Sequence, residues 1–78
     1  MIQIEVAYAL AHKQKIVQLQ VEQGTNARDA VLRSGLDQEF ADLDLAESPL
    51  GIFGKSIARP HEHIVAEGER IEIYRPLL

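Results

Sequence analysis

The amino-terminal part of the chain alternates between apolar and polar side chains with a period of two, and this alternation constrains the fold more than any other feature. Apolar residues occupy every second position of residues 2–8, namely Ile2, Ile4, Val6 and Tyr8. The same pattern returns at Val17, Leu19 and Val21. Because this period is typical of a half-buried β-strand, the two segments predict a hairpin whose polar connection spans residues 9–14.

The pattern changes to a helical period at Gly24-Thr25-Asn26. Asn26 is a favourable N-cap, and the charge of Asp29 is stabilising in a first helical turn. A stripe of small side chains follows at helical spacing: Ala27, Ala30, Val31 and Ser34. With Gly35 as a stop signal, the pattern predicts one helix over residues 27–34. Leu32 lies off this stripe; we favour contact with residues 36–50 over an exposed apolar position.

The second half of the chain has weaker signals. Residues 36–50 are acidic and irregular, and their apolar side chains are expected to pin the segment against the core. Gly51-Ile52-Phe53-Gly54-Lys55 predicts a strand or a strand and turn, and residues 56–65 predict a loop. A turn at residues 67–69 precedes the last strand. This order predicts an α+β fold, the β-grasp, with a mixed four-to-five-stranded sheet on one helix in a single domain of residues 1–78.

Composition narrows the classes of function. The chain of 78 residues carries 12 acidic and 8 basic residues, a net charge of −4. This balance disfavours nucleic-acid binding, which needs clustered basic residues, and favours a protein partner. The absence of cysteine fits a reducing cytoplasm. Neither an export signal nor a membrane-inserting segment is indicated.

Residues with catalytic or metal-binding potential do not form a recognisable site. His61-Glu62-His63 is the densest group of metal ligands, but side chains two positions apart on an extended segment point to opposite sides, and His12 is distant in sequence. A polar turn is the favoured interpretation. The serines lie outside any nucleophile motif, and residues 51–55 lack phosphate-loop spacing. We therefore expect no catalytic residue, no cofactor and no metal ion.

Three side chains are candidates for partner binding. Lys55 is expected to be exposed, and Tyr74 and Arg75 are of types that are enriched at interaction hot spots. The alternative for Tyr74 is that it only covers one end of the sheet, whereas Tyr8 is in register with the core residues of the first strand. The chain ends in Pro76-Leu77-Leu78 and not in the flexible Gly-Gly that a conjugated modifier requires.

Several separated motifs carry a resemblance that covers essentially all 78 residues: Val6-Ala7-Tyr8-Ala9-Leu10, Ser34-Gly35-Leu36, Asp42-Leu43-Asp44-Leu45, Gly51-Ile52-Phe53-Gly54-Lys55 and Arg70-Ile71-Glu72-Ile73-Tyr74-Arg75-Pro76-Leu77. In these motifs the chain resembles the RnfH family of small bacterial proteins, which implies a ubiquitin-like β-grasp. The sequence departs from the family at Ala11, where proline is common, and at Leu78, where a basic tail usually follows.

The resemblance implies a non-catalytic binding function. The family is similar to the antitoxin called RatB or PasI, which is encoded beside a START-like toxin, RatA or PasT, linked to ribosome assembly. We therefore expect a ubiquitin-like, antitoxin-type module that binds such a protein. The alternatives are an accessory protein of the Rnf electron-transport complex, which the family name implies, and a β-grasp carrier or modifier. Open strand edges also make a homodimer conceivable.

Overall fold

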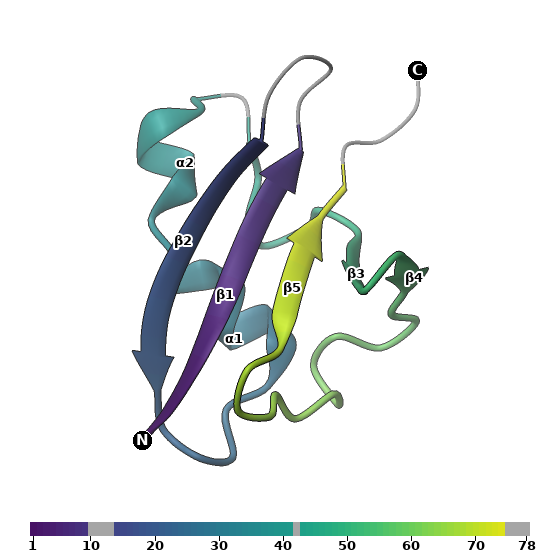
Figure 1. Cartoon of the computed structure of the whole chain (residues 1–78). Helices are drawn as coiled ribbons and strands as arrows, with labels where there is room; N and C mark the ends of the chain where they lie inside the picture. Colours follow the sequence, from purple (N-terminus) through teal and green to yellow (C-terminus); the bar gives the residue numbers. More distant parts are fainter. Residues whose placement is uncertain (10–13, 42, 75–78) are drawn as a thin grey trace.

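The fold is a mixed β-sheet with two short helices on one side. The computed structural model describes residues 1–9, 14–41 and 43–74. In these residues the elements follow one another as β1 (Ile2–Ala9), β2 (Gln14–Val21), α1 (Ala27–Leu32), α2 (Leu36–Glu39), β3 (Leu50–Ile52), β4 (Lys55–Ser56) and β5 (Arg70–Ile73). The strand order is β2-β1-β5-β3-β4 (Figure 1). The predicted α+β architecture is confirmed. The sheet has five strands, where four to five were expected.

The two long strands form the predicted hairpin. β1 and β2 are antiparallel with an unbroken register from Ile2 opposite Val21 to Ala9 opposite Gln14. β5 runs parallel to β1, and β3 is antiparallel to β5. The first and last strands therefore lie side by side within the sheet. The middle of the predicted connection, residues 10–13, lies outside the described residues.

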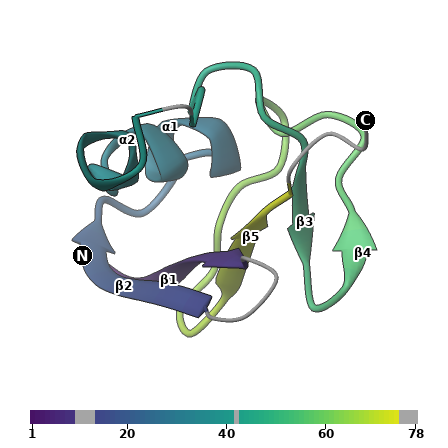
Figure 2. The ribbon, with the colours of Figure 1, turned by 90° about the horizontal axis from the view of Figure 1, so that it is seen from above.

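The core fills the space between the sheet and the helices. Figure 2 shows α1 and α2 on the same side of β1 and β2, with β3 and β4 turned out of the plane of the long strands. The alternating residues of β1 that were expected to be apolar and inward, Ile4, Val6 and Tyr8, are at most 2% exposed. Ile71 and Ile73 of β5 complete this layer. The period of two thus assigned the buried face correctly.

Helix α1 begins as expected and ends early. The Asn26 side chain accepts a hydrogen bond from the Asp29 amide at 2.8 Å, which confirms the N-cap. The helix ends at Leu32, two residues before the predicted end, and Gly35 adopts a left-handed φ of 73° at the start of α2. Leu32 is 47% exposed, so the favoured contact with residues 36–50 is wrong. It lies off the buried stripe of Ala27, Ala30 and Val31.

The segment after α1 is more ordered than its sequence predicts. Residues 36–39 form helix α2, where an irregular chain was expected. The predicted anchoring is confirmed, because Leu36, Leu43 and Leu45 are buried in the core. The ring of Phe40 packs edge-on against Tyr8, with 5.0 Å between the ring centroids. In the described part of the chain, no helix has the length and apolar character needed to span a membrane.

Candidate functional site

The β3–β4 hairpin is the element that displays the candidate binding residues. Gly51 lies opposite Ser56, and Ile52 lies opposite Lys55. Phe53 and Gly54 form the turn between the strands, and both have a positive φ, of 49° and 83°. Two left-handed residues are the signature of the tight turn whose twist matches a hairpin. The strand and turn predicted for residues 51–55 are therefore confirmed.

Phe53 is the exposed aromatic residue of this turn. Its side chain is 71% exposed, and its backbone occupies the left-handed region that bulky residues rarely adopt. Asparagine or glycine fits this turn position with less strain. A residue that is suboptimal for the turn and contributes little to the core is a candidate for contact with another molecule. Sequence reasoning missed Phe53, although an aromatic residue directly before a turn glycine is a visible signal.

The structure places two of the three predicted site residues on the side of the sheet formed by β5, β3 and β4. Lys55 is exposed on β4, as expected, and forms no ion pair with any described residue. Tyr74 follows β5 and is half-buried; its amide donates to the Pro49 carbonyl at 2.8 Å. Arg75 lies outside the described residues.

Glu72 connects Tyr74 to the hairpin turn. One carboxylate oxygen, Oε1, accepts hydrogen bonds from the Tyr74 hydroxyl and from the Gly54 amide, each at 2.8 Å. The hydrogen bond to Glu72 raises the pKa of Tyr74 above its ordinary value, since ionisation would place two negative charges side by side. Glu72 therefore links Tyr74 to the turn of the hairpin.

A groove of about 480 Å³ opens beside the hairpin. Residues 52, 53 and 55–57 form one wall, and His63 and Glu69 form the other. Its lining combines the apolar side chains of Ile52, Phe53 and Ile57 with the cation of Lys55. Such a mixture of apolar surface with a few polar groups is usual for a binding groove.

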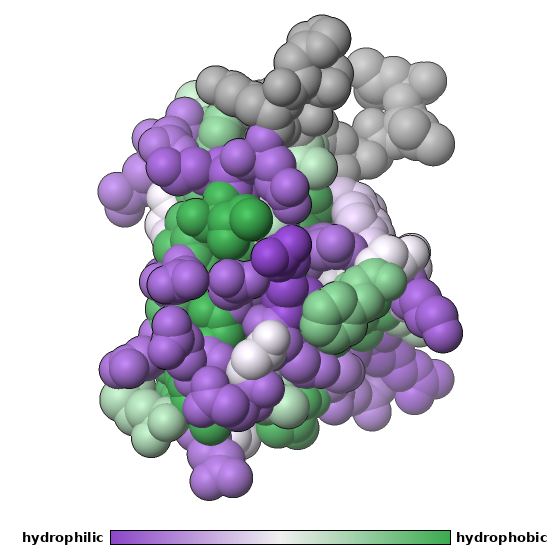
Figure 3. All heavy atoms as spheres, in the orientation of Figure 1, coloured by the Kyte–Doolittle hydropathy of each residue, from purple (hydrophilic) through white to green (hydrophobic). Residues whose placement is uncertain are grey.

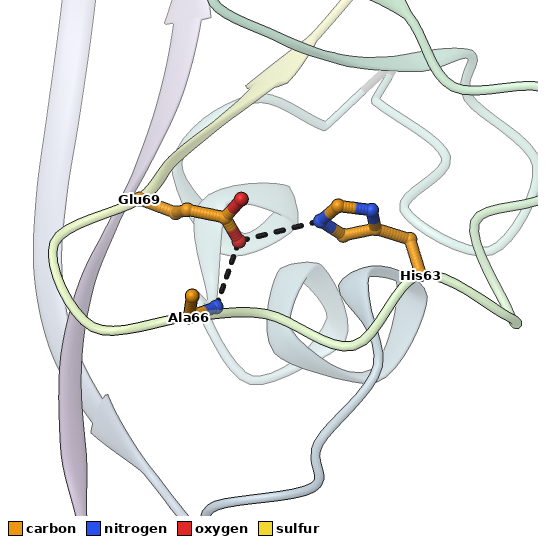
Figure 4. A network of polar contacts seen from close by, with 3 residues as sticks. All are labelled: His63, Ala66 and Glu69. Carbon is orange, nitrogen blue, oxygen red and sulfur yellow. Dashed lines mark hydrogen bonds and ion pairs between the residues drawn. The ribbon is translucent and has the colours of Figure 1, made fainter.

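The second wall is held by a small polar network (Figure 4). Glu69 Oε1 accepts the Ala66 amide at 2.8 Å and lies 3.3 Å from His63 Nε2. The His63 carbonyl in turn accepts the Ala27 amide at 2.8 Å, at the start of α1. His63 is thus part of a structured turn before β5, as predicted. In the described residues, no three potential ligand side chains gather to hold a metal ion.

The outer face of the sheet, away from the helices, is mainly polar. Figure 3 views this face, where hydrophilic side chains predominate and the apolar areas are separated. Arg70 Nε donates to Glu5 Oε1 at 2.9 Å, and Gln18 donates to the other oxygen. These hydrogen bonds, that of Arg70 first, lower the pKa of Glu5 below 4.5. Two apolar residues of this face are Ala7 and Ile16, which lie opposite each other on β1 and β2; Ala7 is 2% exposed and Ile16 is 39% exposed.

Comparison with known proteins identifies the family. The family described as "RnfH family Ubiquitin" matches residues 2–78. The Protein RnfH of Ectopseudomonas mendocina is 58% identical over 77 residues, which cover 99% of this chain and 73% of the relative. The Protein RnfH of Alcanivorax borkumensis is 53% identical, with coverage of 99% and 74%.

A solved structure supports the fold independently. A ubiquitin-like protein from the archaeon Caldiarchaeum subterraneum superimposes with a TM-score of 0.58, covers 99% of both chains and shares 12% of its residues. At this identity the likeness supports the ubiquitin-like β-grasp and nothing about binding. Taken with the near-complete match in sequence, it shows that the chain belongs to the RnfH family of ubiquitin-like proteins.

Proposed function

We propose that this chain is a non-catalytic protein-binding module of the cytoplasm and that its partner docks on the surface around the β3–β4 hairpin. The observation that carries this proposal is Phe53, an aromatic side chain that is 71% exposed on a left-handed turn residue. Aromatic residues contribute a large part of the binding energy at many protein interfaces. Lys55 adds an exposed charge to the same surface.

The proposed partner is a START-like protein of the RatA or PasT type, which makes the chain an antitoxin-type module. The support is the likeness of the RnfH family to the RatB or PasI antitoxin. The chain itself contributes the net charge of −4, which suits a protein partner better than a nucleic acid. The absence of cysteine supports the cytoplasmic location.

The test is a binding measurement with a START-like protein of the RatA or PasT type. Co-purification of the two proteins and heat in a calorimetric titration are expected, with saturation at a fixed stoichiometry. The control is Leu32→Ala, because Leu32 is an exposed apolar residue of α1 that does not line the groove. If neither heat nor co-purification is found for the unmodified chain, this partner is wrong.

A further inference from the structure

We infer that the groove beside the hairpin binds an extended segment of a partner protein, added as a strand at the open edge of β4, with an acidic side chain that pairs with Lys55. This inference deepens the proposed function and rests on its claim that the chain binds a protein. It specifies the chemistry of the bound segment, which must contain an acidic residue two positions away from an apolar residue.

The edge of β4 offers backbone groups to such a segment. β4 is the last strand in the order β2-β1-β5-β3-β4. The Ile57 amide donates to the Leu50 carbonyl at 2.8 Å, so the backbone of Ile57 faces β3. Since neighbouring residues of a strand direct their backbone groups to opposite sides, the amide and carbonyl of Ser56 face away from β3. An added strand would satisfy both groups, which is how many extended peptides bind sheet edges.

The charge of Lys55 selects an acidic segment. The exposed cations Lys15, Arg33 and Arg59 and the half-buried Arg70 each lie within 4.0 Å of a carboxylate. Lys55 has no such neighbour in the described part of the chain. Glu69 of the opposite wall already accepts the Ala66 amide and lies beside His63. Lys55 is therefore the charged side chain of the groove that has no ion-pair partner in the described residues, whereas the Glu69 carboxylate already has hydrogen-bonding partners.

The position of the apolar contact follows from the register of the hairpin. Ile57 directly follows β4 and continues its pairing with β3, so its side chain lies on the same face as that of Lys55, two positions before it, and both side chains line the groove. A strand paired with β4 would place an apolar side chain near Ile57 and, two positions away, a carboxylate near Lys55. Phe53 would cover the end of this contact, since it lines the groove beside Ile52.

The groove is held open by contacts to the rest of the fold. Asn26 and Ile64 form a β-bridge, and the Val65 amide donates to the Thr25 carbonyl at 2.9 Å. These bonds attach the wall that contains His63 to the residues just before α1. Because this wall is already ordered, binding does not cost the conformational entropy of ordering it. Only the bound segment loses conformational freedom, and this smaller entropy cost favours affinity.

The test uses NMR amide shifts of the isotope-labelled full chain with three capped peptides. The probe is Thr-Val-Thr-Glu-Thr, whose valine and glutamate lie on one face of an extended strand. The first control, Thr-Thr-Val-Glu-Thr, has the same composition but places these side chains on opposite faces. The second control, Thr-Val-Thr-Lys-Thr, reverses the charge. Acetate alone is titrated in parallel.

The expected result is that the probe shifts the amides of residues 52–57 and of His63, with at least about fivefold weaker binding of both controls. Lys55→Glu should reverse the order of affinity of the two peptides, so that the lysine peptide binds more tightly than the probe. Absence of these shifts, equal binding of the three peptides, or the same shifts with acetate would overturn the inference. Shifts of these amides on concentrating the chain alone would identify a second copy as the occupant and would also overturn it.

The result separates the inference from the proposed function. If the START-like protein gives binding heat while the probe leaves the groove amides unchanged, the function stands and the inference fails. If the probe binds as expected and the START-like protein gives no heat, the groove is established and the proposed partner fails.

Discussion

The ring of Tyr74 lies directly over Gly51, so that a Cβ atom at position 51 would overlap the ring and its hydroxyl oxygen. Gly51 is the middle residue of β3 and is buried, and its φ is not in the left-handed region. It is therefore the approach of the ring, and not the backbone conformation, that requires glycine here. This contact joins the end of β5 to the hairpin that carries Phe53 and Lys55.

Gly51→Ala is expected to destabilise the fold by about 1–3 kcal/mol, because the added methyl group displaces the Tyr74 ring and breaks its hydrogen bond to Glu72. Urea unfolding of the single variants and of the double variant with Tyr74→Ala measures the coupling. In the Tyr74→Ala background the same substitution should cost much less. An equal cost in both backgrounds would show that the ring is not the obstacle.

The titration of Tyr74 should depend on Glu72. The tyrosine has a raised pKa, above 10.0, so its contribution to stability is complete below that value and is lost as the pH rises through the folded-state pKa. Glu72→Gln removes the negative charge and should return the pKa toward its ordinary value. The measurement is the alkaline titration of tyrosinate absorbance, with Tyr74→Phe to identify the signal. An unchanged titration in the glutamine variant would contradict the assignment.

The Glu5–Arg70 pair should make the fold sensitive to acid. The pKa of Glu5 is lowered from 4.5, so its stabilising effect is present above that value and is lost as the pH falls through the folded-state pKa. Glu5→Gln should therefore lose less stability than the unmodified chain between neutral pH and acid, as followed by thermal unfolding. Glu62→Gln is the matched control, because Glu62 pairs with Arg59 at an exposed site. Identical acid profiles of Glu5→Gln and the unmodified chain would refute this prediction.

Phe53→Asn should separate stability from binding. Asparagine adopts the left-handed conformation more readily than phenylalanine, so the variant is expected to be as stable as the unmodified chain or more stable by about 0.5 kcal/mol. Binding of the partner should weaken because the exposed ring is lost. Denaturant unfolding and calorimetry on the same preparation measure the two effects. A clear loss of stability would mean that Phe53 serves the fold and not the interface.

The long elements of the fold could be predicted because their periods extend over many residues. Eight residues of β1 provide enough alternation to define a buried face, and Asn26 with Asp29 marks the start of α1. Helix α2 has four residues, too few for a helical period to appear, so it was predicted as irregular. Its position depends on burial of Leu36 in the core, which is a tertiary effect.

The proposed binding surface was only partly predictable, for two physical reasons. Lys55 and Tyr74 were identified by residue type, but their common location depends on the pairing of β3 with β5, which lie about 20 positions apart in sequence. The same limit applies to Ala7, which alternates with the core residues of β1 and is nevertheless buried. It is buried because its neighbours across the sheet, Ile16 and Glu72, have larger side chains than its own methyl group.

The most direct test of the binding account is the dissociation constant of the START-like protein for three chains: unmodified, Phe53→Ala and Leu32→Ala. Both substitutions truncate an exposed apolar side chain, one on the hairpin and one on α1. The account predicts at least about tenfold weaker binding for Phe53→Ala, the loss expected at a hot spot, and unchanged binding for Leu32→Ala. Equal dissociation constants for the three chains would contradict it.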